Sequence, residues 1–181
     1  MCNFEEEQGD VIHERYIKMK KYKETVPVKH PETIKIIAFD GTMVRSKAEA
    51  MIYGRLRAAG FYVIYEYPIE YEKGKYVFSD FLLIHPVTGQ IIIIEHLGRW
   101  FYEGGNIEYR NSYLWKTDIF RQIGFVQGVN FYVTFEENSN MDLEKIAKDL
   151  TYLYDTQPTR YAKELEKRQQ AAFVDSILFR N

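Results

Sequence analysis

The stretch YVFSDFLLIHPVTGQIIIIEH, residues 76–96, decides the fold. It contains two strand-like runs, 76–84 and 91–94, separated by the turn sequence Pro86-Val87-Thr88-Gly89. The second run is apolar on both faces, which is typical of a strand in the middle of a covered sheet. Because a hairpin connects the two runs, we expect them to pair side by side.

Further elements flank this pair along the chain. Upstream we expect a helix within 11–22, a short strand within 34–39, a helix over 46–59 and a strand over 61–69. Downstream we expect a helix over 108–123, a strand over 129–135, and helices over 142–154 and 160–178. This order predicts a single α/β domain over 1–181, with a central mixed sheet of about four to five strands flanked by helices.

Three carboxylates occupy positions with apolar surroundings. Asp80 interrupts the first strand-like run, Glu95 ends the second, and Glu49 lies toward the apolar side of the helix that begins at Ser46. Burying a carboxylate is costly unless it is paired or binds a metal. Each also has a structural interpretation: Glu49 completes an S-x-x-E capping box with Ser46, Asp80 alone is compatible with an ion pair, and Glu95 with a strand end facing water.

Taken together, the carboxylates favour a metal site. Asp80 and Glu95 lie on neighbouring predicted strands and point to one end of the sheet. Mg²⁺ takes hard oxygen ligands from one or two carboxylates, water and phosphate. Such an ion activates water and offsets charge on a phosphate, which is the chemistry of phosphodiester hydrolysis.

The composition sets limits on the class of protein. Of the 181 residues, 46% are hydrophobic and 28% charged, and the net charge is −2, which argues against a protein that coats DNA nonspecifically. The one cysteine, Cys2, excludes a disulfide framework within one chain and favours a reducing, cytoplasmic compartment. No apolar run is long enough to span a membrane. The basic stretch from Arg15 to Lys29 is interpreted as a solvated helix face or, less favourably, as a phosphate-binding edge.

The residues that stand out resemble the PD-(D/E)XK nuclease superfamily. The matching segments are Arg45-Ser46-Lys47-Ala48-Glu49, Tyr65-Glu66-Tyr67-Pro68, Ser79-Asp80-Phe81, Ile91-Ile92-Ile93-Ile94-Glu95-His96, Tyr113-Leu114-Trp115-Lys116 and Asn130-Phe131-Tyr132-Val133-Thr134-Phe135-Glu136. The resemblance covers about 40–137 and implies a restriction-endonuclease-like core there. An N-terminal extension would precede it over 1–39, and a C-terminal helical region would follow over 141–181.

The resemblance also implies roles for single residues. Asp80 and Glu95 would bind Mg²⁺ or Mn²⁺ directly, and Glu49 would bind it through water or hold a second ion. Two positions depart from the pattern: Ser79 replaces the usual proline, and Leu97 stands where the family has a lysine that positions the attacking water. Members of the superfamily move this lysine onto the following helix, which makes Lys116 the catalytic candidate. Its alternative is a surface residue that extends its amine to solvent.

Two accessory positions follow from the same match. Glu66 either extends the acidic cluster or forms a salt bridge at a strand edge. His96 should face away from Glu95 because successive strand residues alternate sides, so we expect it to play a structural or DNA-contacting role rather than to bind metal.

The resemblance implies a magnesium-dependent endodeoxyribonuclease, an endonuclease or nickase that acts on nucleic acid, most simply DNA. The first alternative is an inactive nucleic-acid-binding or assembly module on a nuclease fold, which would have lost its activity because Leu97 replaces the motif lysine. The second is a regulator that forms a homodimer or binds a partner protein through its terminal helices. The position of Lys116 separates the enzyme from the inactive module, because only a catalytic amine needs to approach Asp80 and Glu95.

Overall fold

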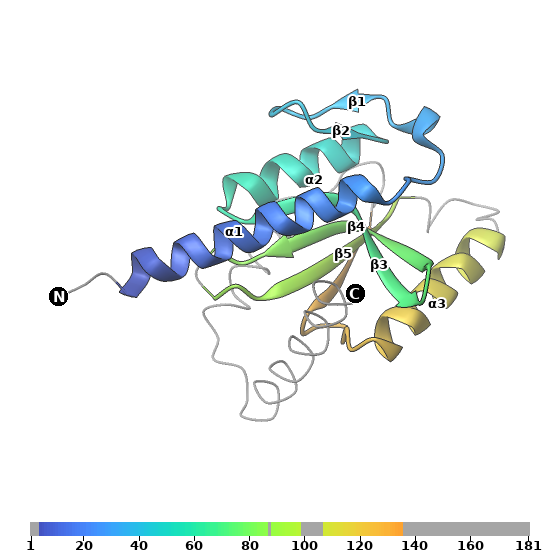
Figure 1. Cartoon of the computed structure of the whole chain (residues 1–181). Helices are drawn as coiled ribbons and strands as arrows, with labels where there is room; N and C mark the ends of the chain where they lie inside the picture. Colours follow the sequence, from blue (N-terminus) through green and yellow to red (C-terminus); the bar gives the residue numbers. More distant parts are fainter. Residues whose placement is uncertain (1–3, 87, 99–106, 136–181) are drawn as a thin grey trace.

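The computed structural model describes residues 4–86, 88–98 and 107–135 (Figure 1). The helices predicted over 142–154 and 160–178 lie outside these residues. The described helices are α1 (Phe4–Thr25), α2 (Lys47–Ala58) and α3 (Ile107–Gln122), with the short 3₁₀ helix η1 (Pro31–Thr33). The strands are β1 (Ile36–Ile37), β2 (Met43–Val44), β3 (Tyr62–Glu72), β4 (Lys75–Ile84), β5 (Ile91–Leu97) and β6 (Phe131–Phe135).

A four-stranded sheet in the order β3-β4-β5-β6 forms the centre of the fold. β3, β4 and β5 are antiparallel neighbours, whereas β6 runs parallel to β5 after the crossover that contains α3. The predicted α/β class and the central mixed sheet, expected to have about four to five strands and found to have four among the described residues, are therefore confirmed. The 34–39 run pairs with β2 in a separate two-stranded hairpin instead of joining the sheet.

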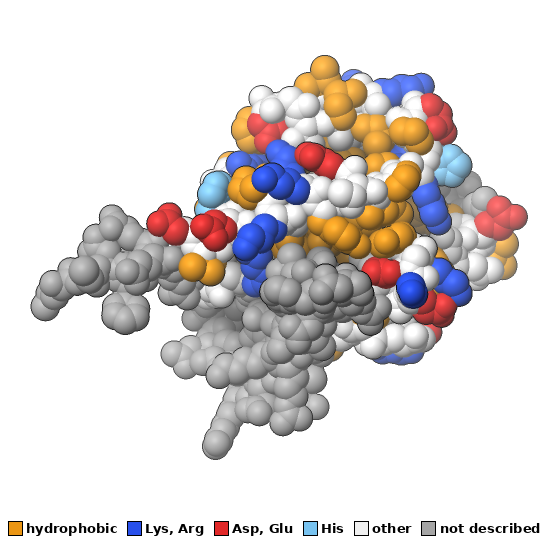
Figure 2. All heavy atoms as spheres, viewed as in Figure 1, with side chains coloured by type: hydrophobic (Ala, Val, Ile, Leu, Met, Phe, Trp, Pro, Cys, Tyr) orange, Lys and Arg blue, Asp and Glu red, His pale blue; other side chains and the backbone are white. Residues whose placement is uncertain are grey.

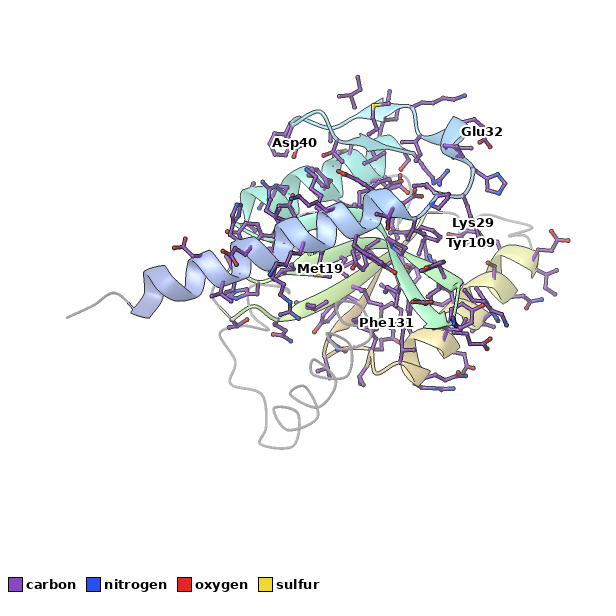
Figure 3. The ribbon with its side chains drawn as sticks, viewed as in Figure 1. Met19, Lys29, Glu32, Asp40, Tyr109 and Phe131 are labelled. Carbon is purple, nitrogen blue, oxygen red and sulfur yellow. The ribbon has the colours of Figure 1, made fainter. Side chains whose placement is uncertain are left out.

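Helices cover both faces of the sheet. α2 packs on one face against a buried apolar cluster that includes Phe81, Leu83 and Ile94. α1 and α3 share the other face, where Met19 of α1 and Phe131 of β6 belong to one buried cluster (Figure 3). The segment before residue 40 thus supplies part of the core through α1, which crosses the sheet in Figure 1.

The strand alternation breaks at one level of the sheet. Tyr65 of β3 packs on the α2 face, but Tyr67, two residues later, packs on the α1 face. The residue between them, Glu66, has a φ of 49°, in the left-handed region that non-glycine residues rarely adopt. β4 changes in the same place, because Phe81 lies on the α2 face and Val77 on the other. Asp80 and Glu66 therefore lie at the level where the alternation of side chains between the two faces of the sheet is interrupted in both strands.

The surface of the described residues carries mixed charge. Figure 2 shows acidic and basic side chains interspersed on one face of the molecule, as the net charge of −2 leads one to expect. None of the described helices combines the length and the apolar character that a membrane-spanning helix needs.

Candidate active site

Asp80 and Glu95 meet where the β4–β5 ladder ends. The last regular pair of that ladder is Phe81 with Ile94. Beyond it, the backbone N–H of Asp80 donates to Oε1 of Glu95 at 3.1 Å, and the N–H of His96 donates to Oδ2 of Asp80 at 2.7 Å. Each carboxylate thus takes the hydrogen bond that a backbone carbonyl of the opposite strand would otherwise accept, which compensates its burial.

The second oxygen of each carboxylate points toward the same ammonium group. Nζ of Lys116, on α3, lies 2.6 Å from Oε2 of Glu95 and 3.7 Å from Oδ1 of Asp80. The lysine side chain is only 21% exposed, and its Nζ lies 6.0 Å from the ring centre of Phe120. Lys116 is therefore directed to the two carboxylates rather than extended into solvent.

Burial and the charges of neighbouring side chains shift the pKa values of Glu95 and Lys116. Burial and the charge of Asp80 raise the pKa of Glu95 to about 8, although the Lys116 ammonium favours the ionised form. Burial works against a charged Lys116, but Glu95 and Asp80 outweigh it, so the pKa of Lys116 is raised. The amine therefore stays protonated at neutral pH.

Glu49 closes the start of α2 and also borders the site. Its Oε2 accepts hydrogen bonds from the backbone N–H groups of Arg45 and Ser46 and from the hydroxyl of Tyr65, at 2.8–3.1 Å. The predicted capping box with Ser46 is confirmed. Burial and the nearby charge of Asp80 raise the pKa of Glu49, which places its carboxylate within electrostatic range of the pair.

Glu66 and His96 have separate roles. Glu66 forms an ion pair with Nε of Arg45, so the predicted salt bridge is confirmed, but Glu66 is buried rather than at an exposed edge. Nδ1 of His96 lies 3.0 Å from Oγ1 of Thr134 on β6. Among the described contacts, His96 thus takes part in the site through its backbone N–H.

Sequence reasoning missed two basic residues near the site. Arg45 holds Glu66 and donates to the backbone carbonyls of Lys29 and His30, which ties the loop after α1 to the sheet. Lys23 of α1 lies with its Nζ 5.8 Å from the ring centre of Tyr65 and interacts electrostatically with Glu66. No spacing rule could identify them, because each reaches the site from an element distant in sequence.

The donor set suits a divalent cation supported by substrate. Within the described ranges, no group of three or more His, Cys, Asp or Glu side chains is arranged to hold a metal by itself. Mg²⁺, however, is commonly bound by one or two carboxylates, with water and phosphate completing its octahedron. Oε2 of Glu95 and Oδ1 of Asp80 already share one positive group, the Lys116 ammonium, so their geometry suits a shared cation.

Comparisons with models of protein families, with curated protein sequences and with solved structures found no match to this chain.

Proposed function

We propose that this chain is a metal-dependent nuclease of the PD-(D/E)XK class that hydrolyses phosphodiester bonds of DNA as an endonuclease or nickase. The observation that carries the proposal is the contact of the Lys116 ammonium with both Asp80 and Glu95. A half-buried lysine placed against one half-buried and one buried carboxylate at a sheet end is the arrangement that the resemblance implies after the lysine has moved to the following helix.

Each residue has a definite part in this reaction. Asp80 and Glu95 would hold Mg²⁺ or Mn²⁺, which supplies the positive charge that activates water and offsets phosphate charge. Lys116, kept protonated by the two carboxylates, would orient the attacking water or stabilise charge on the phosphate in the transition state. Glu49 fixes the start of α2 beside the pair and would contact the ion through water.

The order of elements supports the restriction-endonuclease-like interpretation. A helix that carries Glu49 precedes the β3–β4–β5 meander that carries Asp80 and Glu95, and α3 and the parallel strand β6 follow. The buried side chain of Leu97, 4% exposed, belongs to the core, so no basic group from that position reaches the site.

The decisive experiment is cleavage of supercoiled plasmid and of labelled single-stranded DNA with Mg²⁺ or Mn²⁺. We expect Asp80→Asn to abolish cleavage, and Lys116→Met to slow it by roughly 10²–10³-fold, as losing one transition-state contact does. Asp118→Asn is the matched control, because Asp118 is an exposed acid on α3 that pairs with Arg121. Wild-type protein that cleaves neither substrate, or Asp80→Asn protein that cleaves as well as wild type, would disprove the proposal.

The experiments must also distinguish an active nuclease from an inactive nucleic-acid-binding module. It predicts DNA binding without cleavage and equal binding by wild type and Lys116→Met. The approach of Lys116 to the carboxylates favours the enzyme over this module.

A further inference from the structure

The solvent side of α3 carries exposed apolar side chains next to the candidate active site. Trp115 is 50% exposed and Leu114 is 59% exposed, and both precede Lys116 on the same helix. Ile107, which is 72% exposed, lies seven residues before Leu114 and therefore on the same side of the helix. A tryptophan has the largest apolar surface to bury, so one that leaves half of it in solvent beside a reactive site calls for a ligand.

Tyr71, near the end of β3, holds the indole of Trp115 in place. The two ring centres are 6.0 Å apart and the ring planes are 87° apart, which is an edge-to-face contact. Tyr71 packs in turn against the buried cluster on the α1 face of the sheet. Figure 1 shows the end of the β3–β4 hairpin next to α3. An indole fixed in this way loses little side-chain freedom when a flat ligand binds to its exposed surface.

This aromatic platform, Trp115 with Tyr71, adjoins the site through Lys116. The Cα atoms of Trp115 and Lys116 are about 3.8 Å apart, and their side chains leave α3 about 100° apart around its axis. The ammonium of Lys116 reaches the carboxylates of β4 and β5, while the indole of Trp115 reaches β3. A strand whose phosphate lies at the carboxylates therefore has a neighbouring nucleotide within reach of the indole.

The charges close to the platform suit a polyanion. The acids Glu72 and Asp118 are each paired with a lysine or arginine of the same hairpin or helix. Lys73 in the β3–β4 turn and Arg110 on α3 add exposed positive charge. Aromatic rings flanked by basic side chains are the combination with which proteins bind single-stranded nucleic acid.

We propose that Trp115, supported by Tyr71, stacks on an unpaired nucleobase of the substrate, so that the site acts on single-stranded or locally unpaired DNA. The inference rests on the proposed function and deepens it, because it names the strandedness of the substrate. In a duplex the faces of each base are covered by the neighbouring base pairs, so only an unpaired base can lie on an aromatic side chain. Because every base has such a face, we expect little sequence preference.

The first test measures binding of a fluorescent single-stranded oligonucleotide in EDTA, where no metal-dependent cleavage occurs. Trp115→Ala should weaken binding roughly 5–150-fold, the loss that corresponds to one stacked base. An oligonucleotide of the same length built from abasic sites should bind wild type more weakly, and Trp115→Ala should weaken its binding no further. Phe39→Ala is the matched control and should bind like wild type, because Phe39 is a 72% exposed ring that packs against Tyr53 of α2 on the other face of the sheet.

A second measurement keeps Trp115 in place and decides the matter if Trp115→Ala does not fold. In Trp100→Phe, Trp115 is the one tryptophan of the chain. Its fluorescence should be quenched by the normal oligonucleotide but not by the abasic one. Absence of this quenching, or equal binding by wild type and folded Trp115→Ala, would overturn the platform.

The outcomes separate the platform from the nuclease on which it rests. Binding that depends on Trp115, without cleavage in Mg²⁺ or Mn²⁺, would overturn the nuclease and keep the platform as a binding surface. Cleavage of single strands that is equal in wild type and Trp115→Ala would overturn the platform and keep the nuclease. Wild type that cleaves duplex as fast as single strands would overturn the preference for unpaired DNA. Loss of a dimer in Trp115→Ala with unchanged DNA binding would assign this face to a protein contact and overturn the platform.

Discussion

The two ends of the β4–β5 strand pair differ in how their backbone hydrogen bonds and buried side chains are satisfied. At one end, residues 81–84 pair regularly with 91–94, and every side chain is apolar and buried. At the other end, Asp80 and Glu95 accept the backbone hydrogen bonds themselves, and Lys116 balances their charge. The apolar end is satisfied by its own ladder, while the acidic end depends on side chains from several elements.

Along this one pair of strands, the apolar end contributes mainly to stability, whereas the acidic end carries the reactive side chains. The regular end gains from apolar burial and contributes to a unique packing. The acidic end loses part of that gain to desolvation, which the ammonium and the backbone donors offset only in part. A fold that needed only stability would continue the apolar pattern, so the costly end supports the proposed function.

The largest effect is expected from truncating the apolar end. Phe81→Ala should lower the free energy of unfolding by about 4 kcal/mol, because the ring is fully buried and its loss leaves a cavity. The control, Phe39→Ala, removes a ring that is 72% exposed and should change stability by less than about 0.5 kcal/mol. Urea unfolding followed by circular dichroism measures both, and similar losses in the two variants would contradict the contrast.

The acidic end should make stability depend on pH. The folded pKa of Glu95, about 8, exceeds its ordinary value of 4.5, so the folded chain holds the proton more tightly than the unfolded one. Stability is then greatest below the unfolded pKa and falls progressively as pH rises toward 8. Glu95→Gln, which cannot ionise, should flatten this dependence. Unfolding experiments in EDTA over this pH range test it, and an unchanged slope in Glu95→Gln would assign the dependence to another group.

The sequence predicted the apolar end better than the acidic end. Runs such as 91–94 and the capping box at Ser46 are local patterns, so the starts of β4, β5 and α2 could be predicted within one residue, whereas β5 continues three residues beyond the predicted run. The approach of Lys116 to Glu95 could be inferred only through the resemblance, because 21 residues and a crossover separate the two.

The acidic end also holds features that no sequence pattern encodes. The left-handed backbone of Glu66, its clamp by Arg45 and the position of Lys23 depend on how α1 and its following loop pack against β3. Long-range packing of this kind is not visible in local periodicity. The hairpin of β1 and β2 was missed for a related reason, since two-residue strands give almost no alternating signal.

Removing the ammonium should move the pH dependence without abolishing it. In Lys116→Met, Glu95 loses the charge that favours its ionised form, so its pKa should rise by roughly one to three units. The fall in stability should still begin near the unfolded pKa but should continue to correspondingly higher pH. Arg121→Gln, an exposed change on the same helix, should leave the profile unchanged. The same unfolding series in EDTA measures the pH at which the fall in stability ends, and an end point equal to that of wild type would show that Lys116 and Glu95 are not electrostatically coupled in solution.

The smallest effect concerns Glu49, which belongs to a helix start and borders the acidic end. Ser46→Ala should cost about 1 kcal/mol of stability, because the backbone N–H of Glu49 loses the hydroxyl that caps it. The Glu49 carboxylate should nevertheless keep its place, since the N–H of Arg45 and the hydroxyl of Tyr65 still donate to it. Metal-dependent cleavage by Ser46→Ala at low temperature, where the fold persists, should therefore equal that of wild type. A large loss of cleavage with intact folding would show that the cap itself, rather than the strand carboxylates, sets the geometry of the site.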